Sequence, residues 1–216
     1  MIALPKYSRG HELANSITHG VGIALSVAGL AVLVVLAALK GTVWHVVSFS
    51  IYGATLVLLF TASTLYHSFR SPRVKRVFRV IDHSSIYLLI AGSYTPFSLV
   101  CLRGPWGWSL FGCAWGAALA GIVIKAFFTG RFRIVSTVIY VVLGWMAVIA
   151  LKPLLGVLPL AGFVWLLVGG LVYTSGILFY AWKRLPYHHA IWHLFVLAAG
   201  ICQYIAVLVY VLPTRI

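Results

Sequence analysis

Two histidines stand one helical turn apart near the start of the last apolar stretch of the chain, in the segment His189-Ala190-Ile191-Trp192-His193. On a helix, residues four apart lie on the same face, so both imidazoles can point toward one site. Imidazole nitrogens bind metal ions such as zinc, whereas His188 lies about 100° around the helix and points elsewhere. The spacing therefore indicates half of a metal site, for which the rest of the chain must supply further ligands.

The composition places this pair in a membrane protein. Of the 216 residues, 62% are hydrophobic and only 8% are charged, and the mean hydropathy is +1.06. These values lie far outside the range of soluble domains. The 16 Lys and Arg residues stand against two acids, Glu12 and Asp82, an excess that indicates loops beside an anionic leaflet. Nucleic-acid binding is not expected, because no basic region lies free of the membrane.

Seven apolar stretches are each long enough to cross a hydrocarbon core of about 30 Å, and charged residues with Pro or Gly separate nearly all of them. They cover approximately residues 14–39, 43–67, 80–100, 106–128, 134–151, 155–182 and 188–212. We expect a basic loop at about 68–79 and a break between the fifth and sixth stretches at Lys152-Pro153. The sequence thus predicts an all-α integral membrane protein in which residues 1–216 form a single domain of seven transmembrane helices.

The distribution of Lys and Arg predicts the orientation, because positive charge in short loops is retained in the cytoplasm. Twelve of these residues fall on the side of the N-terminus: Lys6, Arg9, Arg70, Arg73, Lys75, Arg76, Arg79, Lys125, Arg131, Arg133, Lys183 and Arg184. The other four are Lys40, Arg103, Lys152 and Arg215. We therefore expect the N-terminus in the cytoplasm and the C-terminus outside, across a plasma membrane.

Polar and titratable residues at membrane depth are costly and usually face partners inside the helix bundle. They gather at four places: the start of the first span, the end of the second, the start of the third and the start of the seventh. The residues are Glu12, Asn15 and His19; Ser63 and His67; Asp82 and His83; and His189 and His193. Because successive spans alternate in direction, all four places share one side of the membrane and lie at a similar depth.

Three imidazoles with a carboxylate and a water suit zinc, whose catalytic sites commonly use three protein ligands and leave one position open. We predict His67, His189 and His193 as the ligands. Asp82 is expected to bind the water held by the metal or to be a direct ligand, and Ser63 to hydrogen-bond nearby or to stabilise an oxyanion. The alternative is that each histidine is an ordinary hydrogen-bonded residue of the bundle.

The neighbours of these residues are less informative. His83 and His188 are expected to project away from the site and to pack or hydrogen-bond elsewhere. Glu12, Asn15 and His19 either form a polar network that supports the site or simply mark the entry of the first helix into the membrane.

The polar motifs, taken in order, resemble those of a known family. They are Glu12-x-x-Asn15-x-x-x-His19, Ser63-x-x-x-His67, Asp82-His83 followed by Tyr94-Thr95-Pro96-Phe97, and His189-x-x-x-His193 with Ile191-Trp192 between. Together they resemble the bacterial haemolysin III branch of the progestin and adipoQ receptor family, which is related to adiponectin receptors and alkaline ceramidases. The resemblance implies a seven-helix fold with zinc near the cytoplasmic side. It also implies that His67, His189 and His193 bind zinc, with Asp82 and Ser63 close to the metal-bound water.

Three function classes remain open at this point. The first is a zinc-dependent intramembrane hydrolase of a lipid amide or ester, within membrane-lipid homeostasis, with membrane lipids and one zinc ion as its partners. The second is a lipid sensor or regulator in which zinc only joins two spans. The third is a haemolysin-like pore, although no polar stripe runs the length of a span as a conduction path needs. Hormone-receptor function is not expected, because the long N-terminal region of the animal receptors is missing. The sequence does not predict the oligomeric state.

Overall fold

The computed structural model describes residues 7–128 and 133–214, with the backbone alone at Arg133. Seven helical segments of this part of the chain are long and apolar enough to cross a membrane, as the sequence predicts. Four of them are single helices: α1 (Arg9–Lys40), α2 (Val43–Ser68), α4 (Pro105–Phe128) and α7 (Leu160–Ala181). The other three are built from more than one helical piece. Of the charges used to predict the orientation, Lys6, Arg131, Arg215 and the side chain of Arg133 lie outside the described residues.

The third and seventh spans both end in a short π-helix. Helix α3 (Pro72–Pro96) continues into η1 (Phe97–Cys101), and α8 (His188–Ile205) continues into η3 (Ala206–Val211). Pro96 has no N–H to donate, so the hydrogen-bond ladder widens after it, and the Leu102 N–H donates to the Phe97 carbonyl over 2.9 Å. The polypeptide of the third span therefore bends without leaving the bundle.

The fifth span differs most from the sequence-based prediction. It consists of α5 (Arg133–Gly144), the 3-10 helix η2 (Met146–Ala150) and α6 (Leu151–Val157). The junction with the sixth span lies at Leu158-Pro159, later than the predicted break at Lys152-Pro153. Pro153 falls in the first turn of α6, where the backbone N–H has no partner within the helix and proline is tolerated. The predicted break is therefore a change of helix type inside one span.

The predicted basic loop at about 68–79 is also mostly helical, because α3 begins at Pro72. Proline at the first helical position is preorganised for a helix start, and long basic side chains can extend from a helix end toward the membrane surface. Helix α1 likewise begins earlier than its apolar stretch, at Arg9. Both helices thus begin before the predicted apolar spans, and their first turns form part of the polar end of the molecule.

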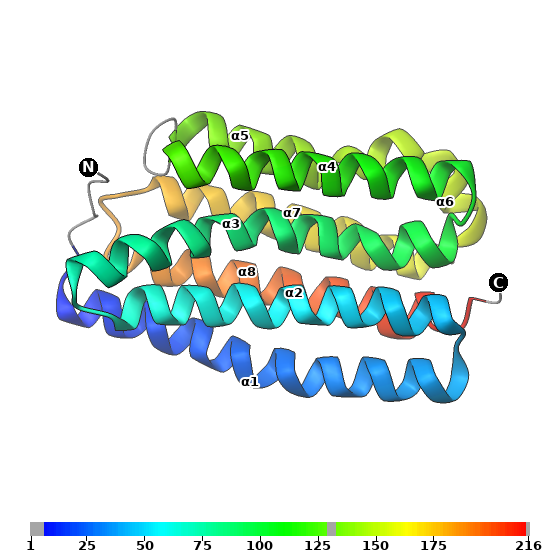
Figure 1. Ribbon diagram of the computed structural model, residues 1–216, viewed down its shortest axis with the longest axis horizontal. Helices are drawn as coiled ribbons and strands as arrows, with labels where there is room; N and C mark the ends of the chain where they lie inside the picture. The colour runs from blue at the N-terminus through cyan, green and yellow to red at the C-terminus, as the bar shows by residue number, and fades with distance from the viewer. Residues whose placement is uncertain (1–6, 129–132, 215–216) are drawn as a thin grey trace.

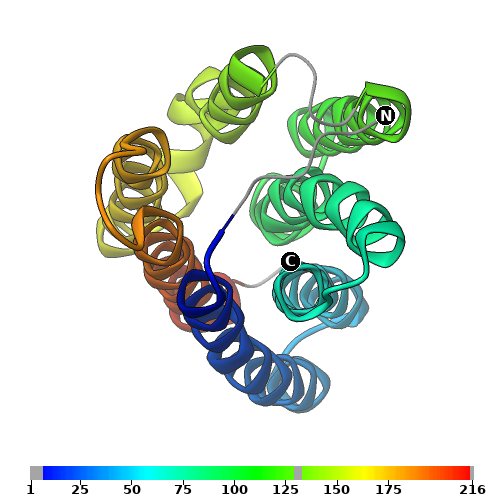
Figure 2. The same ribbon diagram turned by 90° about the vertical axis from the view of Figure 1, so that its left-hand side faces the viewer.

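The helices run alternately in opposite directions, so that α1, α3 and α8 all begin at one end of the bundle (Figure 1). Figure 2 views the molecule from this end and shows the helices arranged in a ring, with α1 beside both α2 and α8. The last turn of α2 also lies at this end. The ring therefore brings the first, second and last spans together although they are far apart in the sequence.

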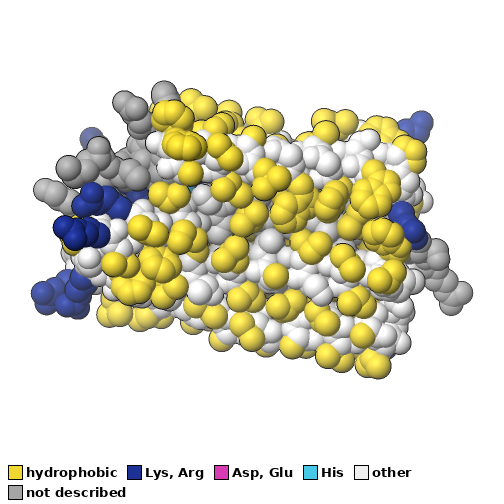
Figure 3. All heavy atoms as spheres, viewed as in Figure 1, with side chains coloured by type: hydrophobic (Ala, Val, Ile, Leu, Met, Phe, Trp, Pro, Cys, Tyr) yellow, Lys and Arg dark blue, Asp and Glu magenta, His cyan; other side chains and the backbone are white. Residues whose placement is uncertain are grey.

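The outer surface is that of a protein that faces lipid. Large hydrophobic side chains are widely exposed, for example Leu39 at 75% and Ile134 at 81%. On the face drawn in Figure 3, hydrophobic side chains cover the length of the bundle, while Lys and Arg gather toward its two ends. Exposure of this extent over a whole molecule is costly in water and favourable in a bilayer.

Gly107 marks the closest approach of α4 to the preceding π-helix. A Cβ atom at this position would lie 2.1 Å from the Ser98 carbonyl oxygen and 2.5 Å from that of Leu102. Both obstacles are backbone atoms, which cannot rotate away as a side chain can. Glycine is therefore required here so that α3, η1 and α4 can pack.

We expect Gly107→Ala to lower the midpoint of thermal unfolding in detergent by roughly 5 °C or more, because overpacking against backbone forces the helices apart. The matched control is Gly112→Ala on the same helix, where nothing lies within 4 Å of the added carbon. Alanine favours a helix over glycine, so the control midpoint should stay the same or rise. Equal midpoints for the two variants would contradict this packing.

Candidate metal centre

Three histidines from two helices converge at the end of the bundle where α1, α3 and α8 begin. His67 lies in the last turn of α2, and His189 and His193 lie in the first two turns of α8. Each offers a ring nitrogen, and these three atoms lie within 4.8 Å of one another. The side chains are almost fully buried, with exposed fractions of 3%, 8% and 0%. The structure thus brings together the three residues that the sequence predicts as metal ligands.

Each histidine of this cluster has a buried ring nitrogen with no hydrogen-bond partner among the described residues. These atoms are Nε2 of His67, Nδ1 of His189 and Nε2 of His193. A buried imidazole nitrogen without a partner is costly, and the three clustered histidines each have one in the described structure. Three imidazole nitrogens in this arrangement fit the donor set of a zinc ion that keeps one further position.

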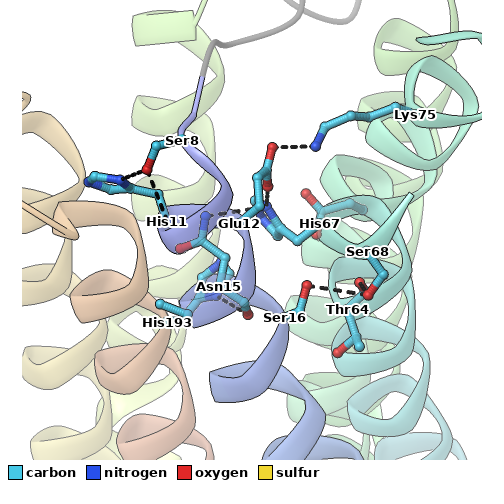
Figure 4. Close-up of polar contacts among 12 residues, drawn as sticks. Ser8, His11, Glu12, Asn15, Ser16, Thr64, His67, Ser68, Lys75 and His193 are labelled. Carbon is cyan, nitrogen blue, oxygen red and sulfur yellow. Dashed lines mark hydrogen bonds and ion pairs between the residues drawn. The ribbon is translucent and has the colours of Figure 1, made fainter. Parts of the chain in front are cut away.

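Residues of helix α1 contact the Nδ1 atoms of two of the three histidine rings (Figure 4). The Nδ1 atom of His67 lies 2.6 Å from a carboxylate oxygen of Glu12, and the Asn15 amide nitrogen lies 3.3 Å from it. Nδ1 of His193 lies 3.2 Å from both the Thr18 hydroxyl and the Asn15 carbonyl oxygen. Such contacts fix the ring and direct the opposite nitrogen toward the centre, as the outer neighbours of metal-binding histidines do.

The role of Glu12 and Asn15, which the sequence leaves open, is therefore to anchor the cluster. Glu12 also accepts a hydrogen bond from Lys75 in the first turn of α3. Thr18 and Lys75 are absent from the sequence-based prediction. Thr18 follows Asn15 by three residues and so shares its helix face, which could have predicted its contact from the sequence. The contact of Lys75 could not be predicted in this way, because it depends on where α3 begins.

His19 belongs to the same cluster by packing. Its ring stacks on that of His193, with a distance of 3.6 Å between ring centroids and 13° between planes. Both of its nitrogens are buried and have no hydrogen-bond partner in the described part of the chain. His19, for which the sequence leaves two roles open, thus packs directly against the predicted ligand His193.

Asp82 lies near the cluster but is not one of the three converging groups. It lines an internal cavity together with His19 and His189. Its carboxylate lies 3.2 Å from Nδ1 of His83, which lines the same cavity. The prediction that His83 projects away from the site is therefore wrong, because α3, which begins at Pro72, is oriented so that Asp82 and His83 both line the cavity.

Ser63 stands one turn before His67 on α2 and is 1% exposed. Its hydroxyl has no hydrogen-bond partner among the described residues. A serine in a helix commonly donates to the carbonyl four residues earlier. The Ser63 hydroxyl therefore remains available as a donor close to the histidine cluster along the helix.

Tyr7 packs beside the cluster and Tyr187 packs against His11, and the sequence predicts neither as a site residue. The ring of Tyr7 lies 5.5 Å from that of His189 and 6.3 Å from that of His67. Tyr187 stacks on His11 at 4.4 Å, with its backbone in the left-handed region at φ 56°. An aromatic side chain before an apolar span reads as an interfacial residue, so nothing in the sequence distinguishes these two from the other aromatic residues.

The cavity that Asp82 lines has a volume of about 180 Å³ and lies between α3, α5, α7 and α8. A second cavity, of about 250 Å³, lies beside it and is lined mainly by residues of α3, η1, η2, α6 and α7, together with Gln203 of α8. Away from the histidine end, the walls are mainly apolar, with residues such as Leu89, Val141, Ile177 and Val196. The site thus combines a polar end with an apolar interior.

Comparison with known proteins supports one family. A family model described as haemolysin-III related matches residues 7–204. Hemolysin-3 of Bacillus cereus is 49% identical over 203 residues, which cover 94% of this chain and 93% of that protein. The Hemolysin-3 homolog of Bacillus subtilis (strain 168) is 48% identical over 199 residues, or 92% and 93% of the two chains.

A more distant relative is the human monocyte to macrophage differentiation factor, which is 29% identical over 203 residues, covering 91% of this chain and 83% of that protein. No solved structure matches the chain. The matched region includes every residue of the histidine cluster and of its support from α1. The chain belongs to the haemolysin III family, as its polar motifs predict.

Proposed function

We propose that the protein binds one zinc ion through His67, His189 and His193 and hydrolyses an amide or ester bond of a membrane lipid. The observation that supports this most strongly is the convergence of three buried imidazoles, each with a ring nitrogen that has no hydrogen-bond partner among the described residues. One of them, His189, lines the polar end of a mainly apolar cavity. Zinc with three protein ligands supplies a Lewis acid that activates water. The histidine cluster thus suits hydrolysis of a bond located at the membrane surface.

Asp82 is the proposed proton acceptor. It is one of two acids in the chain, and the other, Glu12, is occupied by His67 and Lys75. Its carboxylate lines the cavity beside His19 and His189, where the reacting bond of a substrate would lie. His83 contacts this carboxylate and orients it. A general base must reach the proton it removes, and Asp82 is the acidic residue that lines this cavity.

Ser63 is the proposed donor to the oxyanion. Its hydroxyl is buried and makes no hydrogen bond to another described residue. A donor that is already in place and already desolvated stabilises developing negative charge more than a solvated one does. The apolar walls of the two cavities would hold the lipid chain, since they exclude water and offer little hydrogen bonding.

A lipid sensor or regulator with a structural zinc is the second candidate. The anchoring of His67 by Glu12, and of His193 by Asn15 and Thr18, favours it, because the centre then joins α1, α2 and α8 into one unit. Structural metal sites stabilise a fold in this way. The two candidates differ in whether the protein needs the Asp82 carboxylate.

A haemolysin-like pore, the third class, is less well supported. The cavities are lined mainly by apolar residues beyond the histidine end. A conduction path needs polar groups along its length or a wide aqueous lumen. The name Hemolysin-3 belongs to the relatives, and we do not extend that activity to this chain.

We propose an inner-membrane location with the N-terminus and the histidine cluster on the cytoplasmic side. The charge distribution supports this, since most Lys and Arg residues lie on that side of the spans. Lys75, Arg76, Arg79 and Lys183 lie at the same end of the described bundle as the cluster. The zinc centre would then meet its substrate at the inner leaflet.

Asp82→Asn is expected to reduce turnover of a lipid amide or ester by about 100-fold or more, because the amide keeps the shape of the side chain but accepts no proton. The measurement is lipidomics of cells that carry the wild-type or the variant chain, in which the substrate should accumulate. Zinc content should be retained. A matched control is Ser26→Ala, since Ser26 lies on α1 and its hydroxyl bonds to the Ile23 carbonyl within the helix. Unchanged lipid composition would favour the sensor instead.

The orientation can be tested with a reporter that is active only in the cytoplasm. Fused to the C-terminus it should be silent, and fused to the N-terminus it should be active, because seven spans place the two ends on opposite sides. Protein levels of both fusions should be matched by immunoblot. A strong signal from the C-terminal fusion would contradict the proposed orientation.

A further inference from the structure

The two cavities adjoin in the middle of the bundle, at a junction that we call the waist. Five residues line both of them: Ser93, Gly144, Trp145, Gly170 and Gln203. The first cavity extends from the waist to the polar end, and the second extends toward the opposite end of the bundle. A chain-like ligand that fills both cavities would therefore pass these five residues.

Gln203 differs from the other polar side chains at the waist. The Ser93 hydroxyl donates to the Ile90 carbonyl over 2.8 Å, and the Trp145 ring nitrogen donates to the Thr174 hydroxyl over 3.0 Å. Gln203 is half-buried, and its amide makes no hydrogen bond to any residue that the structure describes. Two donors and two acceptor positions on one lining side chain are thus without a hydrogen bond to the described residues.

The side chain of Gln203 packs against Gly169 of α7. A Cβ atom on Gly169 would lie 3.2 Å from Cγ of Gln203, so the glycine leaves room for the glutamine side chain between α7 and α8. An amide at membrane depth is costly to leave without hydrogen bonds, and leucine or valine would fill the same space at lower cost. A hydrogen-bonding group that enters the cavities would therefore stabilise this amide.

The position of Gln203 along the bundle defines where that group must be. Gln203 follows His193 on α8 by ten residues, from 193 to 203, which corresponds to about 15 Å along the helix axis. A ligand whose head lies at the histidines would reach Gln203 partway along its chain. An unsubstituted hydrocarbon chain offers nothing to an amide at this point.

We infer that Gln203 recognises a hydroxyl or carbonyl group carried partway along the chain of the bound lipid, so that the ligand is an oxygenated rather than a plain acyl chain. This inference rests on the proposed function, which places the lipid in the two cavities with its head at the histidine cluster. The amide accepts from a hydroxyl or donates to a carbonyl, and its two ends allow both at once. Gln203 is thus a specificity residue remote from the metal centre.

The test measures binding and does not depend on hydrolysis. Purified protein in detergent is loaded with a fluorescent fatty acid, which is displaced by octadecanoic acid, by its mid-chain hydroxy derivative, or by the derivative hydroxylated beside the carboxyl group. The mid-chain hydroxy acid should bind about tenfold more tightly than octadecanoic acid, as one net hydrogen bond in a desolvated site implies. The derivative hydroxylated beside the carboxyl should show no such gain at the waist.

Gln203→Leu should remove the preference for the mid-chain hydroxyl while octadecanoic acid still binds. The matched control is Ser93→Ala, because Ser93 lines the same waist but already donates to the Ile90 carbonyl. This control should keep the preference. If Gln203→Leu does not fold, the comparison of the hydroxyl positions in the wild-type protein decides alone.

The outcomes separate the inference from the proposed function. Equal binding of all three acids by the wild-type protein would overturn the inference and leave the lipid cavity intact, with water as the partner of Gln203. A preference that persists in Gln203→Leu would also overturn it. No displacement by any acid would overturn both the inference and the proposed lipid site.

Discussion

The contact between Glu12 on α1 and His67 on α2 is the interaction on which the rest of the polar end depends. A carboxylate oxygen of Glu12 lies 2.6 Å from Nδ1 of the buried His67 ring, and this contact directs the Nε2 atom toward the histidine cluster. At membrane depth such polar groups find no water and must be satisfied by one another or by an ion. Asn15 applies the same constraint to His67 and His193, so that α1 aligns residues of two other helices.

This constraint explains why the site lies at one end of the bundle and why the cavity beside it is apolar. Lys75 forms an ion pair with Glu12 and so balances its negative charge, although the lysine side chain is itself buried. Deeper in the bundle, Asp82 and His83 form a second pair in the lining of the cavity. Beyond them the walls are mainly apolar, with a few hydroxyl-bearing side chains and Gln203. The polar end suits chemistry on a lipid head, and the interior suits its chain.

Much of this arrangement follows from the sequence. The alternating direction of the spans places His67 on the same side of the membrane as His189 and His193 and at a similar depth, without any knowledge of packing. The number of spans follows from apolar length in the same way. The junction at Leu158-Pro159 does not, because Pro153 is compatible both with a break and with the first turn of a helix.

Contacts between helices are the part that sequence periodicity does not determine. Lys75 meets Glu12 only because α3 begins at Pro72, and His83 faces the cavity only because of the rotation of α3. Gln203 looks in the sequence like a single polar residue in an apolar span. Its position at the junction of two cavities depends on Gly169 of the neighbouring helix.

The most direct measurement of the central proposal is the zinc content of the purified protein. The wild-type chain should carry about one zinc, and a variant with both His189→Ala and His193→Ala should carry almost none, because two of three ligands are lost. His45→Gln is the matched control: His45 is buried at the other end of α2, where its ring accepts a hydrogen bond from the Thr42 N–H. This control should keep its zinc. Full zinc content in the double variant, with the fold verified by thermal unfolding, would contradict the assignment of the histidine cluster as the metal centre.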